Sequence, residues 1–111
     1  MNEPTGWLTV PDVASQLGVE PGKVRQMFRE HHLLAVRDGG VLRVPADLLD
    51  DGHVVKGLSG VLTLLSDAGY ADDEMLRWLF SDDDALPGRP VDALRQNRGT
   101  EVKRRAQTMG F

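Results

Sequence analysis

Basic and amide side chains gather at two places in the first half of the chain. These candidate site residues are Lys23, Arg25, Gln26, Arg29, Arg37 and Arg43. Ammonium and guanidinium groups pair with phosphate oxygens, while Gln and Arg can make paired hydrogen bonds to base edges in the major groove of DNA. These residue types are therefore suited to a double-stranded nucleic acid, provided that the fold presents both places to the same partner.

Other chemistries find less support in the sequence. Cysteine is absent, which excludes thiol nucleophiles, zinc-thiolate sites and disulfides. His31 and His32 are adjacent and His53 stands alone, so the histidines do not have the spacing of metal ligands. The run Asp82–Asp84 lacks the alternating ligands and terminal glutamate of a calcium loop. We therefore expect no enzymatic activity, no metal and no cofactor.

Charge is distributed unevenly around a net charge of −4. Residues 1–45 carry five basic and five acidic side chains, residues 46–86 two basic and ten acidic, and residues 87–111 six basic and two acidic. A neutral beginning, an acidic middle and a basic end predict separate surfaces for separate partners. The acidic middle should repel DNA.

Two short helices are expected first. Residues 9–17 have Thr9 as N-cap and Asp12 placed to return the capping bond, and Gly18 ends the helix. Pro21 begins the second helix at a favoured first-turn position. The apolar positions of this second helix are Val24, Met27 and Phe28. Their spacing turns them toward a core and leaves Gln26 and Arg29 facing outward.

A hairpin should follow the two helices. Residues 35–37 and 41–44 alternate in polarity around an Asp-Gly-Gly centre, which is a strong short-range hairpin signal. Pro45 ends the second strand, and residues 46–52 should form one helical turn. The remaining expected elements are helices at residues 58–68 and 72–80, a short turn at 91–94 and a final helix from Thr100 onward.

The order of helix, glycine turn, helix, Leu-Leu, glycine hairpin and Arg-Val-Pro in residues 8–45 resembles the excisionase and MerR-like winged helix-turn-helix group. The whole chain is similar to a small family of actinobacterial DNA-binding regulators, in which this beginning precedes VVKGLSGVLTLLSDAGY, WLF and RPVDAL. The resemblance implies that the second helix is a recognition helix for the major groove and that the hairpin is a wing.

The resemblance and the chemistry of the side chains together give each candidate residue a role. Gln26 is suited to adenine, and Arg29 to guanine or phosphate, with Lys23 and Arg25 beside them. On the wing, Arg37 and Arg43 should reach phosphate or the adjacent minor groove and position the protein. Glu20, Glu30 and Asp38 lie close to these cations in the sequence and weaken the local positive field.

The second half carries a shorter resemblance. Trp78-Leu79-Phe80 and the later GRPVDAL are similar to the C-terminal domain of antitoxins of the Xre and MbcA type, which binds toxins and self-associates. On that basis Trp78 and Phe80 are candidate anchors for a protein partner. Aromatic residues at a helix end are more often part of a core, in which case this half only braces the first.

The sequence therefore predicts a mainly α protein, with a winged helix-turn-helix at residues 7–50 and a helical part at 54–111 for packing, dimerisation or partner binding. The expected function is sequence-preferring binding of double-stranded DNA by a transcriptional regulator, as a homodimer because one small domain covers few base pairs. The alternatives are an antitoxin-like module that binds a toxin and an excisionase-like factor that bends DNA. No secretory signal or membrane span is evident, which predicts a cytoplasmic protein.

Overall fold

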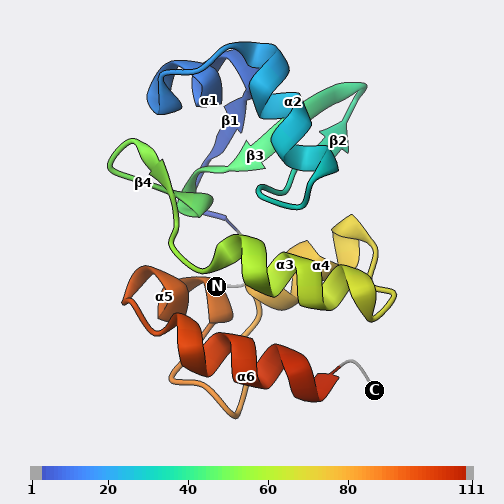
Figure 1. The fold of residues 1–111 in the computed structure, drawn as a ribbon, viewed down its shortest axis with the longest axis vertical. Helices are drawn as coiled ribbons and strands as arrows, with labels where there is room; N and C mark the ends of the chain where they lie inside the picture. The colour runs from blue at the N-terminus through green and yellow to red at the C-terminus, as the bar shows by residue number, and fades with distance from the viewer. Residues whose placement is uncertain (1–3, 110–111) are drawn as a thin grey trace.

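The computed structural model describes residues 4–109 (Figure 1). The elements of the first half are β1 (Trp7–Thr9), α1 (Val10–Leu17), α2 (Pro21–Arg29), β2 (Val36–Asp38) and β3 (Val41–Pro45). After them come the 3-10 helix η1 (Ala46–Leu48) and the strands β4 (Leu49–Asp50) and β5 (His53–Val54), and the second half then consists of α3 (Leu58–Asp67), α4 (Asp72–Leu79), α5 (Pro90–Arg95) and α6 (Gly99–Met109). This order confirms a mainly helical fold with a winged helix-turn-helix followed by a helical part.

The first helix begins and ends at the residues that the sequence predicts. The Thr9 hydroxyl accepts a hydrogen bond from the Asp12 amide (3.2 Å), and the Asp12 carboxylate accepts one from the Thr9 amide (3.1 Å). Gly18 closes α1 in the left-handed conformation, with φ of 70°. α2 starts at Pro21 as predicted and packs against α1, so the two helices form a helix-turn-helix unit.

The predicted hairpin is confirmed as β2 and β3, but it belongs to a larger sheet. β1 pairs antiparallel with β3, so the strand order is β1-β3-β2. Leu8 of β1 lies opposite Val44 of β3, and Thr9 lies opposite Arg43. β1 was not predicted, because its residues Trp7–Thr9 are too few to show alternation and the strand exists only through pairing with residues far along the chain.

The single helical turn expected at residues 46–52 is only partly correct. η1 occupies Ala46–Leu48, and the chain then forms a second hairpin in which Leu49 pairs with Val54. Asp51 and Gly52 make its turn with φ of 50° and 80°. Positive φ at both central residues defines a turn for which Asp-Gly is a preferred dipeptide, so this pair was a hairpin signal that the sequence analysis did not use.

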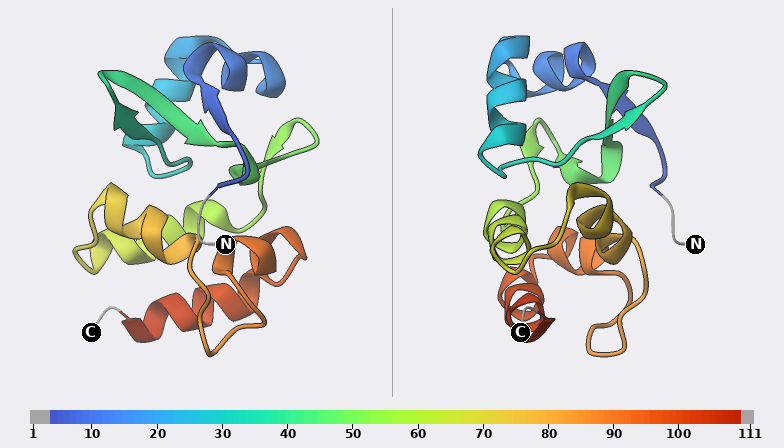
Figure 2. Two further views of the ribbon diagram at one scale, coloured as in Figure 1. Left: turned by 180° about the vertical axis from the view of Figure 1, so that it is seen from behind. Right: turned by 90° about the vertical axis from the view of Figure 1, so that its right-hand side faces the viewer.

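The C-terminal helices agree with the predictions except at their ends. α3 and α4 stop at Asp67 and Leu79 because Ala68 and Phe80 serve as their C-caps. A complete helix, α5, replaces the expected turn at residues 91–94, and α6 starts at Gly99. α3 and α6 pack side by side, and α5 and α6 lie at the end of the molecule opposite α1 (Figures 1 and 2).

One apolar core extends through both halves of the described chain. Its buried members include Val13, Val24, Val44, Leu48, Leu58, Leu65, Phe80, Leu94 and Val102. Residues from α1, α2 and β3 thus belong to the same buried cluster as residues from α3, α5 and α6. Each half therefore covers apolar surface of the other, which contributes to the stability of both.

The loop after α4 is held by a buried carboxylate. The Asp83 oxygens accept hydrogen bonds from the Ala85 amide (2.9 Å), from Arg105 Nε (3.0 Å) and from Trp78 Nε1 (3.2 Å). Burial raises the pKa of Asp83, but the hydrogen bonds from Ala85, Arg105 and Trp78 outweigh it, so the pKa lies below its usual value. Asp83 thereby connects α4 to α6.

We predict that Asp83→Asn lowers the free energy of unfolding by about 1–3 kcal/mol, since a buried acceptor is lost while Arg105 is partly in water. Because the folded pKa is lowered, the stabilisation by Asp83 is complete above its unfolded pKa, near about 4, and is lost as pH falls through the folded value. Urea unfolding at several pH values measures both effects. The exposed neighbour serves as control, and an equal loss in Asp84→Asn would contradict the assignment.

Candidate nucleic-acid interface

α2 presents a basic side to solvent. Its exposed cations are Lys23, Arg25 and Arg29. Val24 is fully buried, and Met27 and Phe28 are half-buried against the core, so the predicted inward face of this helix is confirmed. Gln26 is also half-buried and lies nearer the packed side than the spacing predicts.

The wing separates its two arginines. Side chains alternate between the faces of a strand, and residues directly opposite each other share a face. Arg37 lies opposite Leu42, whereas Arg43 lies opposite Val36 and Thr9. Leu42 and Arg43 are neighbours on β3, so Arg37 and Arg43 project from opposite faces of the sheet.

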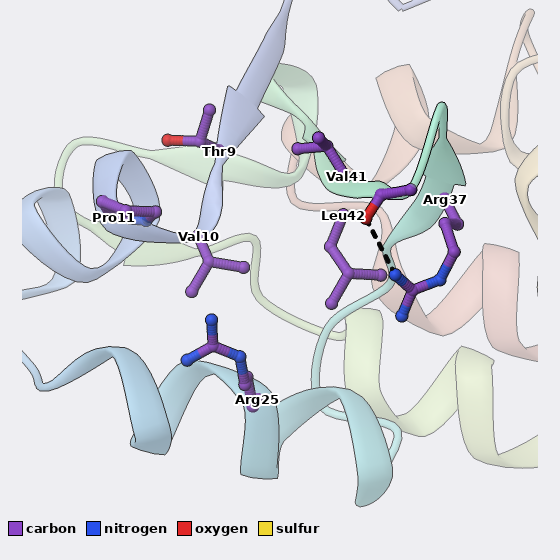
Figure 3. Close-up of a pocket in the computed structure, with 8 residues that line it drawn as sticks. Thr9, Val10, Pro11, Arg25, Arg37, Val41 and Leu42 are labelled. Atoms are coloured by element: carbon purple, nitrogen blue, oxygen red, sulfur yellow. Dashed lines mark hydrogen bonds between the residues drawn. The ribbon is translucent and has the colours of Figure 1, made fainter.

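The face that carries Arg37 also meets α2. A hollow of about 330 Å³ lies between the start of α1, the middle of α2 and the wing. The described residues that line it are Thr9, Val10, Pro11, Arg25, Arg37, Gly40, Val41 and Leu42. In Figure 3 the guanidinium of Arg25 rises from α2 toward Val10 and Leu42, and the guanidinium of Arg37 lies beside Leu42. The fold thus brings together two cations that are separated in sequence, and these lining residues include no carboxylate.

The turn of the wing holds Arg37 in place. Gly39 and Gly40 have φ of 58° and 82°, which fits the tight turn predicted from the Asp-Gly-Gly centre. Arg37 Nη1 donates a hydrogen bond to the Gly40 carbonyl (3.0 Å), shown dashed in Figure 3. The remaining donors of the guanidinium stay available for a phosphate.

Acidic neighbours engage two of the candidate residues. Gln26 Nε2 donates a hydrogen bond to a Glu30 carboxylate oxygen (3.0 Å), one helical turn away. Arg43 Nε lies 3.5 Å from Asp38 Oδ2, and because the Asp38 side chain is 76% exposed this ion pair is weak. Within residues 4–109, Lys23, Arg25 and Arg29 have no ion pair. These three are therefore the cations of α2 that are ready to bind an anion.

The outer face of the sheet carries a feature that the sequence analysis missed. Trp7 is 41% exposed and lines a shallow hollow with Val36, Asp38 and Arg43. Only the pairing of β1 with β3 places Trp7 beside the wing, so no local sequence pattern could have revealed it. The aromatic ring of Trp7 therefore lies near Arg43, whereas the described residues that line the hollow at Arg37 include no aromatic side chain.

Within residues 4–109, no cluster of His, Cys, Asp and Glu side chains has the arrangement of a metal site. None of the helices described there has the length and apolar character that crossing a membrane requires.

The helix-turn-helix, the three-stranded sheet and the basic hollow between them define a winged helix-turn-helix protein. A family model described as "DNA-binding protein Rv2175c, wHTH domain" matches residues 2–49, and one described as "Rv2175c C-terminal domain of unknown function" matches residues 55–110. The chain belongs to the Rv2175c family.

A relative and a solved structure agree with this assignment. "DNA-binding protein Rv2175c" of Mycobacterium tuberculosis (strain ATCC 25618 / H37Rv) is 44% identical over 123 aligned residues, which cover 99% of this chain and 83% of the relative. The NMR structure of Rv2175c superposes with a TM-score of 0.87 at 42% identity, covering 98% of this chain and 84% of that one. The fold described above is therefore that of an experimentally determined relative.

We predict that Gly40→Ala lowers the free energy of unfolding by about 1–2 kcal/mol, because a left-handed backbone is strained for any residue with a Cβ. The added methyl would meet nothing within 4 Å, so conformation alone is tested. Gly60→Ala in α3 is the control: its space is equally open and its φ is not positive, so it should stabilise by up to about 1 kcal/mol. Thermal unfolding measures both, and a shift of the same sign in the two variants would contradict the turn geometry.

Proposed function

We propose that this protein binds double-stranded DNA through α2 and the wing. The observation that carries the proposal is the hollow between α2 and the wing, where Arg25 and Arg37 converge without a carboxylate among the lining residues. A DNA phosphate is the anion that a winged helix-turn-helix meets between its recognition helix and its wing. The M. tuberculosis relative is named a DNA-binding protein, which supports the same function here.

The exposed side of α2 is proposed to enter the major groove. Arg29, at the end of α2, reads guanine or holds phosphate, and Gln26 reads adenine once it exchanges its hydrogen bond to Glu30 for one to the base. Lys23 and Arg25 contact phosphates beside the groove. Each base contact contributes discrimination, so we propose that binding is sequence-preferring.

The wing is proposed to position the protein on the duplex. Arg37 binds a phosphate from the face toward α2, and Arg43 binds from the outer face, beside Trp7. Since the two arginines face opposite ways, they contact different phosphates or different strands. A duplex lying against the wing therefore has contacts on both sides of the hairpin.

Transcriptional regulation in the cytoplasm is the proposed biological role, without catalysis or a cofactor.

The second half contributes packing: Leu62, Leu65 and Phe80 are buried within the chain, so they do not supply an apolar surface for a second copy. A homodimer, if formed, has to use other residues. We propose that the chain is divided functionally into residues 7–50, which make the DNA contacts, and residues 54–111.

The antitoxin-like alternative loses its proposed anchors. Phe80 is 1% exposed, and Trp78 is half-buried with its indole N–H bonded to Asp83. Neither side chain is exposed for contact with a partner in this conformation.

The excisionase-like alternative predicts strong bending of DNA, which the gel mobility of circularly permuted fragments measures directly.

The proposed base contacts are tested by alanine substitutions on α2. Gln26→Ala and Arg29→Ala should each cost about 1–3 kcal/mol on a selected preferred site and relax discrimination at one base position. Arg37→Ala and Arg43→Ala should weaken binding to all sequences alike and reduce the salt slope by about one unit. Fluorescence anisotropy against salt, after circular dichroism has confirmed folding, gives these quantities.

The basic side chains at the other end of the molecule provide the control for those variants. Lys103→Ala and Arg104→Ala, both on exposed positions of α6, should leave affinity unchanged. If they abolish binding while Arg29→Ala and Arg43→Ala have no effect, the DNA surface is the basic end of the chain and the proposed interface is wrong.

We further predict that Glu30→Gln strengthens DNA binding by about two- to fivefold, equivalent to about 0.5–1 kcal/mol. The substitution removes a negative charge beside Arg29 and Gln26 but keeps a side-chain oxygen that can still accept the hydrogen bond from Gln26. Asp84→Asn, on an exposed loop of the second half, changes net charge equally and is the control. An equal gain in both variants would show that only net charge matters.

A further inference from the structure

The root of the wing, which is residues 46–50 directly after β3, is tied to the second half by an arginine. Arg95 of α5 donates from Nη1 to the carbonyl oxygens of Asp47 (2.8 Å) and Leu49 (2.7 Å). Its Nη2 lies 3.8 Å from Asp50 Oδ1. These acceptors follow β3 in the chain, so Arg95 fixes the backbone from which the wing emerges.

A buried carboxylate at the same point ties down the other end of the sheet. Asp47 Oδ1 accepts hydrogen bonds from the Thr5 amide (3.0 Å) and hydroxyl (3.1 Å), just before β1. Arg89, directly before α5, lies 3.8 Å from Asp47 Oδ2. The Ala46 amide also donates to the Gly6 carbonyl (2.9 Å). The adjacent ends of β1 and β3 are therefore both anchored next to α5.

The recognition helix has its own connection to the second half. His31 follows α2 with φ of 59°, and its Nε2 lies 3.2 Å from Ser66 Oγ of α3. The His32 amide donates to the Met27 carbonyl (2.9 Å), so this turn continues directly from α2. α3 and α5, which both pack on α6, thus hold the end of α2 and the root of the wing, respectively.

We propose that the C-terminal half, described in its family only as a domain of unknown function, sets the separation of α2 and the wing, with Arg95 as the main positioning residue. This inference rests on the proposed DNA binding. A duplex must contact α2 and the wing at the same time. If the wing moved freely relative to α2, each binding event would have to order it, and this entropy cost would lower the affinity for DNA. Arg95 itself lies on α5, away from α1 and α2 (Figure 1), and acts through the backbone at Asp47 and Leu49.

The test is Arg95→Ala in the full chain. We expect affinity for all duplexes to fall roughly tenfold, with the salt slope of the parent, because no phosphate contact is removed. Arg37→Ala should instead reduce the slope. Arg95→Lys should restore part of the affinity, since an ammonium can still donate to the carbonyl of Asp47 or Leu49.

A matched control separates positioning from general loss of stability. Arg105→Ala breaks the hydrogen bonds to Asp83 in the second half but leaves the wing root intact, so it should lower the melting temperature without changing DNA affinity. If Arg105→Ala weakens binding as much as Arg95→Ala, the second half only stabilises the fold and the inference is wrong. It is equally wrong if Arg95→Ala binds like the parent, or loses affinity with a reduced salt slope.

A measurement on the free protein keeps the two proposals distinct. Residual dipolar couplings report the orientation of the sheet relative to α2, and we expect Arg95→Ala to change it while Arg105→Ala does not. If the parent binds no duplex, the proposed function fails, yet these couplings still show whether Arg95 orients the wing. An unchanged orientation in Arg95→Ala overturns the positioning role.

Discussion

The burial of the Asp47 carboxylate is the constraint on which the arrangement of the halves depends. Its side chain is only 8% exposed, and a carboxylate in such a place is costly unless it is paired and hydrogen-bonded. Thr5 satisfies one oxygen and Arg89 lies beside the other. Meeting this requirement brings the segment before β1, the end of β3 and the start of α5 to one point. The two halves consequently have little freedom to move apart there.

The charge distribution fits this arrangement. The ten acidic residues of segment 46–86 belong to η1, β4, α3, α4 and the loops beside them, whereas the candidate DNA-binding cations lie on α2 and the wing. A duplex approaching the molecule is attracted by the cations of α2 and the wing and repelled by the acidic segment 46–86. The net charge of −4 is therefore compatible with DNA binding, because the sign of the charge differs from one surface to another.

Local sequence patterns predicted most of the helices and strands, but they did not predict how these elements pair and pack. The capping box of Thr9 and Asp12 and the Gly39-Gly40 turn depend on neighbouring residues, so both were predicted correctly. β1 depends on pairing with β3, and the opposite directions of Arg37 and Arg43 depend on the register of that sheet. The convergence of Arg25 and Arg37, which carries the functional proposal, joins elements remote in sequence and could not have been predicted from spacing.

Thr9 joins the sheet to the helix-turn-helix within the proposed DNA-binding surface. It is the last residue of β1 and also the N-cap of α1, so the sheet that carries the wing continues directly into the helix-turn-helix. α1 packs on α2, α2 is joined to α3 through His31 and Ser66, and α5 returns to the root of the wing through Arg95. Each part of the surface is thus held from two sides. A surface held in this way loses little conformational entropy on binding, so under the proposed function a small domain with few phosphate contacts would retain more of their free energy as affinity.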